Sequence, residues 1–181
     1  MKIKLVSICA IFLIFAVNIF AQSLNTRLDG LTRPRLTETD KKENKTINTS
    51  ELEKLALTLI NKERAAMNLK DLVWSDDAAK VARLHSRNMA ENFFFNHRGL
   101  DGLMVDERAY SLGVKKWQAI GENIAFNRGY DSPTEFAVEC WMNSAGHRAN
   151  ILNNRWTETG IGVAVASDGA FYFTEVFLER K

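Results

Sequence analysis

Residues 159–179 read TGIGVAVASDGAFYFTEVFLE. The pair Asp168-Gly169 lies between two runs rich in apolar residues, and an Asp-Gly pair in that setting is a strong short-range signal for a β-hairpin. The sequence therefore predicts two antiparallel strands, over residues 159–166 and 170–179, joined by a turn at 167–169.

Both faces of the predicted hairpin carry apolar side chains. On the second strand, Phe173 and Phe177 share one face, and Tyr172 and Val176 share the other. A sheet that is apolar on both faces must be covered on both. We therefore predict an α+β fold, a three-layer α-β-α sandwich in which a small antiparallel sheet lies between two layers of helices.

The spacing of apolar residues predicts the helices that form these layers. Helices are expected over about residues 50–67, 75–92 and 104–112, with Ser50 and Ser75 as N-caps. A fourth begins at Ser132-Pro133, because proline is favoured at the first helical position. The expected buried faces are Leu52, Leu55, Ala56, Leu59 and Ile60, then Ala78, Val81, Ala82, His85 and Met89, and in the fourth helix Phe136, Ala137, Cys140 and Trp141.

Other patterns mark the segments between these helices. Residues 72–74 are predicted to be an apolar connector, and 93–95 an aromatic anchor before a loop that is rich in polar residues and glycine. Alternating apolar residues over 119–126 predict a further strand or extended segment.

The N-terminus has the layout of a secretory signal peptide. Two lysines precede an apolar run that ends at Ala21, so cleavage is expected there, and residues 1–21 are the expected leader. An uncleaved membrane anchor is the alternative, because the apolar run nearly reaches spanning length. Residues 22–50 are polar and predict a disordered linker, which leaves 51–181 as the folded domain.

Composition excludes some classes of function. The 24 basic and 22 acidic residues nearly balance, with no basic stripe, so no nucleic-acid partner is expected. One of the two cysteines lies in the expected leader, and Cys140 is the other. No internal disulfide is therefore expected in the mature protein, and Cys140 is expected to pack as a small hydrophobic residue.

Three short stretches each offer a side chain that can exchange protons or bind a metal. The stretch WMNSAGHRANIL (141–152) carries His147 just after a glycine, GENIA (121–125) carries Glu122, and FNHR (95–98) carries His97. A carboxylate at the start of an apolar segment needs a partner, and a histidine is a suitable one. His85 is expected either to be a satisfied core histidine or to line a cavity.

These motifs, together with the strand TGIGV (159–163), resemble the CAP superfamily, named for cysteine-rich secretory, antigen 5 and pathogenesis-related 1 proteins. The domain is also called SCP. The resemblance is to the bacterial secreted branch and covers about residues 50–181. It implies an α-β-α sandwich with a central cavity that is lined by two histidines and two acidic residues.

Carried over residue by residue, the resemblance places His97, Glu122 and His147 at that cavity, with Asn123 beside them. The second acid follows a Trp-aromatic pair by two positions in animal and plant members, and Ser144 stands at that place here. This departure removes a carboxylate from the set. The disulfides of eukaryotic members are absent as well.

Two imidazoles and one carboxylate can bind a divalent ion, and zinc is the expected one if any is bound. The same groups can instead hydrogen-bond with one another. The resemblance implies a secreted, non-enzymatic module that binds a small apolar ligand, a lipid or a cell-envelope component. The alternatives are a metal-assisted hydrolase that uses the same cavity, and a structural surface protein that is tethered by its N-terminus.

Overall fold

The computed structural model describes residues 47–180. The predicted leader or anchor and most of the predicted linker lie outside these residues. Within the described residues, no helix has both the length and the apolar character that a membrane span requires.

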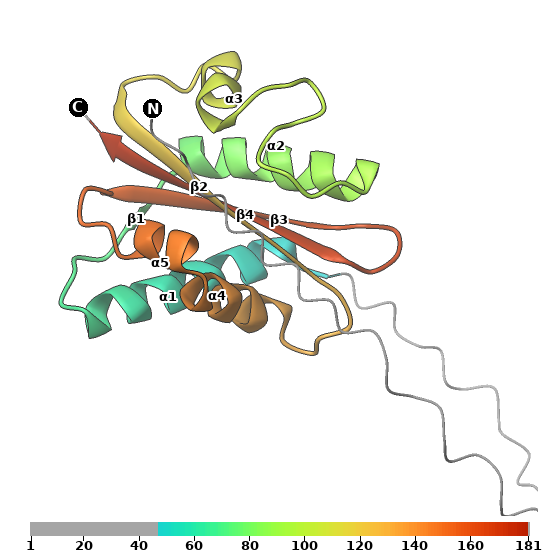
Figure 1. Ribbon diagram of the computed structural model, residues 1–181, viewed down its shortest axis with the longest axis horizontal. Coiled ribbons are helices and arrows are strands. Elements are labelled where there is room, and N and C mark those ends of the chain that lie inside the picture. The colour runs from blue at the N-terminus through green and yellow to red at the C-terminus, as the bar shows by residue number, and fades with distance from the viewer. Residues whose placement is uncertain (1–46, 181) are drawn as a thin grey trace, which may run out of the picture. The chain divides into compact units, whose positions relative to one another are not determined.

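A four-stranded sheet forms the middle of the domain, in the order β1-β3-β4-β2 (Figure 1). β4 pairs antiparallel with both β2 and β3, and β1 pairs parallel with β3. The strands are β1 (Val73–Trp74), β2 (Trp117–Asn127), β3 (Glu158–Val165) and β4 (Phe171–Arg180). β1 was expected to be a connector, and it instead adds a short parallel edge to the predicted antiparallel sheet.

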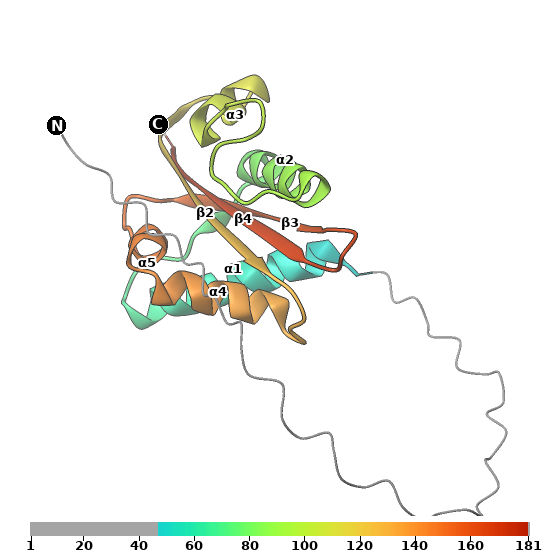
Figure 2. The same cartoon turned by 45° about the vertical axis from the view of Figure 1, so that its right-hand side comes forward.

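Helices cover both faces of the sheet, so the predicted three-layer sandwich is confirmed. One layer holds α2 (Asp76–Asn92) and α3 (Val105–Ser111), and the other holds α1 (Thr49–Ala66), α4 (Pro133–Asn143) and α5 (Ala145–Ile151) (Figures 1 and 2). The core on the α1 side gathers around Trp141, Phe173 and Phe177, and the core on the α2 side gathers around Val81 and Val176.

The predicted hairpin is confirmed. The Asp168-Gly169 turn joins β3 to β4, and Gly169 has a φ of +82°, which suits glycine. Two other glycines set the distance between α2 and the sheet, because a Cβ on Gly160 would lie 2.0 Å from the backbone nitrogen of Ala79, and one on Gly162 would lie 2.3 Å from that of Arg83. Small residues in β3 therefore allow α2 to pack closely on the sheet.

Some local expectations were wrong. α1 begins at Thr49, with Asn48 rather than Ser50 as its N-cap, whereas Ser75 does cap α2 as predicted. On α1, Ala56 and Ile60 are buried as expected, but the polar Glu53 and Arg64 are buried with them. Glu53 lies there because its carboxylate accepts hydrogen bonds from Arg83 and from the backbone of Val163.

The aromatic anchor and the α4 face also differ from expectation. Phe93 and Phe95 are 58% and 45% exposed, so only the intervening Phe94 packs against the core. Phe93 ends α2 in the left-handed conformation, which turns the chain away from the helix. On α4, Phe136 and Cys140 are half-buried.

Candidate functional site

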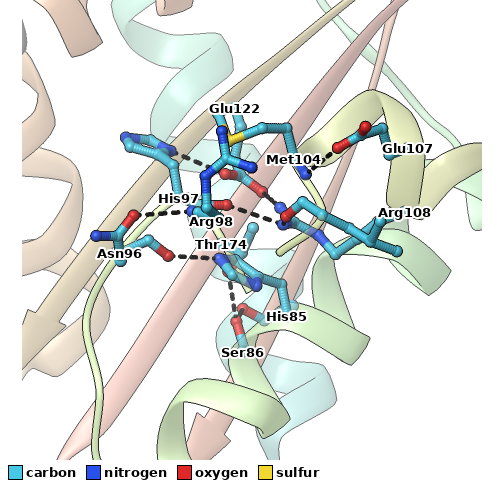
Figure 3. A network of polar contacts seen from close by, with 12 residues as sticks. His85, Ser86, Asn96, His97, Arg98, Met104, Glu107, Arg108, Glu122 and Thr174 are labelled. Carbon is cyan, nitrogen blue, oxygen red and sulfur yellow. Dashed lines mark hydrogen bonds and ion pairs between the residues drawn. The ribbon is translucent and has the colours of Figure 1, made fainter. Parts of the chain in front are cut away.

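A buried ion pair is the centre of the candidate site. The side chains of Arg108 and Glu122 are 1% and 3% exposed, and a guanidinium nitrogen of Arg108 donates to Glu122 Oε2. The other carboxylate oxygen, Oε1, lies 2.8 Å from Nδ1 of His97 (Figure 3). Because a carboxylate only accepts hydrogen bonds, Nδ1 of His97 carries the hydrogen. The predicted pairing of His97 with Glu122 is therefore present, with Arg108 as a third member.

Arg108 also fixes the loop that carries His97. Its Nη1 donates to the carbonyl oxygens of His97 and Leu103, each at 2.9 Å. Arg108 was not predicted from the sequence, although a basic side chain on the short helix before the GENIA motif could have suggested a partner for Glu122. Arg108 thus neutralises the carboxylate and positions the histidine at the same time.

His85 supports the same loop from α2. It is fully buried, and its Nε2 lies 2.9 Å from the carbonyl oxygen of Asn96 (Figure 3). Nε2 therefore carries the hydrogen. Burial, more than any neighbouring charge, lowers the pKa of His85 below its ordinary value. Of the two readings of His85, the structure favours a core histidine that anchors a loop.

β2 directs Glu122 and Asn123 to opposite faces of the sheet, as alternation along a strand requires. Glu122 meets Arg108 of α3, whereas Asn123 is fully buried on the α5 side. Its Nδ2 donates to the backbone oxygen of His147 at 3.2 Å, and its Oδ1 accepts from Asn150 at 2.9 Å. Asn123 therefore supports α5 and is not brought together with His97.

The structure does not join His147 to the carboxylate in the way it joins His97. Among the hydrogen bonds and ion pairs of residues 47–180, none links the His147 ring to Glu122. The ring is half-buried, and burial, followed by the charge of His97, lowers the pKa of His147. The influence of His97 indicates that the two imidazoles belong to the same neighbourhood.

Ser144 lies at the junction of α4 and α5. Its backbone nitrogen donates to Trp141 O, and its backbone oxygen accepts from Arg148. The hydroxyl is buried and makes no hydrogen bond within the described part of the chain. Ser144 is therefore the corner residue that orients α5.

Side chains from the WMNSAGHRANIL motif bind the free edge of β2. The indole nitrogen of Trp141 donates to Ile124 O at 3.0 Å, and Asn150 Nδ2 donates to Glu122 O at 3.3 Å. Both carbonyls lie on a strand that pairs on one side only, with β4. Two of the motifs that carry the family resemblance, WMNSAGHRANIL and GENIA, are thus physically coupled, since the first supplies hydrogen-bond donors for the backbone of the second.

Two half-exposed aromatic rings lie next to the polar centre along the chain. Phe95 precedes His97 by two residues and Phe126 follows Glu122 by four, and each is 45% exposed. Their ring centroids are 6.2 Å apart, and Phe126 also contacts Tyr172. Exposed aromatic rings that contact one another are typical of an interaction site.

The residues do not fit a divalent metal as they are arranged. Within residues 47–180, no three His, Cys, Asp or Glu side chains are grouped closely enough to hold an ion. Both oxygens of Glu122 are engaged, by His97 and by Arg108. Zinc binding by His97, Glu122 and His147 therefore stays a prediction that this arrangement does not support.

Two hollows lie elsewhere on the domain. One of about 460 Å³ lies between α1, β1 and the start of α2, and is lined by Glu53, Trp74 and Arg83 among others. Another of about 240 Å³ lies between α1 and α4, beside Leu59 and Met142. Neither is lined by His97, Glu122 or His147, so the candidate site is a surface centred on His97 rather than either of these hollows.

A family model for the cysteine-rich secretory protein family, CAP, matches residues 57–177, and the chain belongs to this family. The domain is similar to the extracellular, SCP-domain protein of Bacillus anthracis, with 32% identity and a TM-score of 0.63 over 74% of this chain and 41% of that one. The CAP fold is therefore shown both by the family model and by a solved structure.

Two curated relatives come from Bacillus subtilis. The chain is 38% identical to the uncharacterized membrane protein YlbC, over 71% of this chain and 34% of YlbC. It is 37% identical to the uncharacterized protein YkwD, over 62% of this chain and 42% of YkwD. The chain thus spans less than half the length of the curated relatives it matches.

Proposed function

We propose that this chain is an exported, non-enzymatic binding domain that takes a small apolar ligand, a lipid or another cell-envelope component. The binding surface is centred on His97, with Glu122 and Arg108 behind it and Phe95 and Phe126 beside it. His147 belongs to the same surface.

The geometry around Glu122 supports this proposal. Because Arg108 neutralises the carboxylate and His97 uses Nδ1 to bind it, the remaining nitrogen, Nε2, is the group that a ligand can meet. The His97 side chain is 31% exposed, Phe95 lies two residues before it in the chain, and the exposed ring of Phe126 contacts that of Phe95. A fixed hydrogen-bonding group beside exposed aromatic rings is suited to ligands that are mostly apolar and carry a polar end.

A fluorescent apolar probe, 1-anilinonaphthalene-8-sulfonate, tests the proposal. We expect saturable binding to the wild-type domain and an affinity at least about tenfold lower, about 1.4 kcal/mol, in His97→Ala and in Phe126→Ala. Tyr110→Ala is the matched control, since Tyr110 is 55% exposed and contacts Trp117 rather than the site. Equal affinity in all four proteins would contradict the proposal.

The His97–Glu122 pair also favours a second candidate, a hydrolase in which a carboxylate orients a histidine as general base. The double variant His97→Ala/His147→Ala separates the two functions. Turnover of peptide or ester pools by the wild type, lost in the double variant, would establish the hydrolase and overturn the non-enzymatic proposal. No turnover in either protein is the expected result.

Export is the remaining part of the proposal. It is supported by the predicted leader and by the extracellular Bacillus anthracis relative, whereas YlbC is described as a membrane protein. Cell fractionation with N-terminal sequencing distinguishes the two outcomes. A chain that starts at Gln22 outside the membrane fraction is expected, and a membrane-bound chain that keeps residues 1–21 would show an anchored surface protein instead.

A further inference from the structure

Glu175 is a buried acid that the proposed function does not use. It lies in the middle of β4 with no exposed surface, on the face that also presents Phe173 and Phe177 to the α1 side of the sheet. An ionised carboxylate in such a position is costly unless a counter-ion is paired with it. The partners of Glu175 therefore decide in which form it exists.

The described residues provide no ion pair for Glu175. The charged side chain that acts on it is Arg64 of α1, which is 1% exposed. The guanidinium of Arg64 is committed elsewhere, because its Nε and Nη1 donate to the backbone oxygens of Lys70, Ile151 and Asn153. Arg64 thus binds the C-terminal end of α5 instead of the carboxyl group.

The neutral partners of Glu175 fit a protonated acid. Oε2 accepts from Asn123 Nδ2 of β2 at 3.3 Å, and Oε1 lies 3.4 Å from Thr159 Oγ1 of β3. The Thr159 hydroxyl has one hydrogen, and Val176 O is nearer to it, at 3.0 Å. The Thr159 hydroxyl therefore donates its hydrogen to Val176 O, and a protonated Glu175 carboxyl donates to Thr159 Oγ1. In agreement, burial raises the pKa of Glu175 to about 8.

Two groups that act on Glu175, Asn123 and Arg64, also hold α5. Asn123 donates to the backbone oxygen of His147, and Arg64 donates to that of Ile151. The other residue of α5 in this network, Asn150, is neutral and acts through Asn123. From α4, the apolar Trp141 packs into the same core. An ionised Glu175 would attract the Asn123 amide and the Arg64 guanidinium, and so draw both away from α5.

We infer that Glu175 is a positioning residue for His147, that it acts as the protonated acid, and that its ionisation in alkaline solution loosens α5. The inference rests on the proposed function only in placing His147 at the binding surface. Urea unfolding and the histidine ring resonances are measured without a ligand, so their outcome does not depend on ligand binding.

Glu175→Gln tests this inference, because glutamine keeps the shape of the neutral acid and cannot ionise. Urea midpoints are measured for the wild type and the variant between about pH 6 and about pH 9.5. The wild-type midpoint is expected to fall across this range by more than that of Glu175→Gln. Glu179→Gln is the matched control, since Glu179 is on the same strand but is partly exposed and paired with Arg155. It should follow the wild type.

The ring resonances of the three histidines give the second readout. Between about pH 7.5 and about pH 9.5, the His147 signal of the wild type should shift or broaden, and that of Glu175→Gln should not. A difference in midpoint between wild type and Glu175→Gln that is the same at every pH would overturn the inference. If the variant fails to fold, the carboxyl ¹³C signal of Glu175 in the wild type decides, since an ionised group at pH 6 is incompatible with it.

Discussion

Arg108→Met is the substitution that tests the candidate site most severely. Methionine keeps much of the length of the arginine side chain but removes its charge and its donors. Glu122 would lose its ion-pair partner while remaining 3% exposed, and the backbone oxygens of His97 and Leu103 would lose their donors. Because both side chains of the pair are buried, water can replace little of the interaction that Arg108→Met removes.

The magnitude follows from that burial. Removing one partner of a buried ion pair costs about 3–5 kcal/mol, a large part of the roughly 5–15 kcal/mol that stabilises a domain. We therefore expect the free energy of unfolding, measured by urea denaturation at neutral pH, to fall by about 4 kcal/mol. The double variant Arg108→Met/Glu122→Gln should recover much of this loss, because no unpaired charge then remains buried.

Arg83→Met provides a matched control on α2. Arg83 also pairs with a buried glutamate, Glu53, but its own side chain is 39% exposed. Its removal should therefore cost less than that of Arg108, because water can reach the bridge. A loss below about 1 kcal/mol for Arg108→Met, or a double variant that is less stable than the single one, would contradict the cost assigned here to an unpaired buried charge.

Four further outcomes are expected. Gly162→Ala should destabilise the domain by about 3 kcal/mol in urea denaturation, because its Cβ would meet the backbone of Arg83, which cannot move without α2; an unchanged midpoint would contradict this close packing. Trp141→Phe should lower the free energy of unfolding by about 1–3 kcal/mol, since Ile124 O loses its donor, and it should speed amide exchange along β2. Because the pKa of His85 is lowered in the folded state, the unfolded chain takes up a proton first as the pH falls below 6.5, so stability should decline there and level off once the folded state is protonated too. His85→Gln should flatten this decline in thermal melts measured over a series of pH values. Elemental analysis of protein purified without chelators should find well below one zinc ion per chain, and full occupancy would show that Glu122 exchanges a protein partner for a metal.

The layers of the fold could be predicted from sequence because they depend on local patterns. The Asp168-Gly169 turn and the apolar alternation around it specify the hairpin, and helical spacing specifies α1 and α2. β1 could not be predicted in this way, because a strand of two residues, Val73 and Trp74, shows no period. β1 forms because the backbone of residues 73–74 pairs with that of β3.

The site was predictable in part for the same reason. His97 and Glu122 are chemically conspicuous, and the structure brings them together at 2.8 Å. Arg108 was missed because an arginine on a short helix is usually solvated, and its burial depends on the fold of the loop before it. Asn123 was grouped with Glu122 by sequence proximity, although strand alternation directs the two to opposite faces.

The candidate site depends on how Glu122 orients the His97 ring, and the tautomer of the neutral ring measures that orientation. Long-range ¹H–¹⁵N spectra at a pH where the ring is neutral distinguish the two nitrogens, and a His97→Asn variant assigns the signal. The structure predicts that Nδ1 carries the hydrogen, because it donates to Glu122, and that Nε2 is left for a ligand. A neutral His97 with its hydrogen on Nε2, or a tautomer unchanged by Glu122→Leu, would contradict the account.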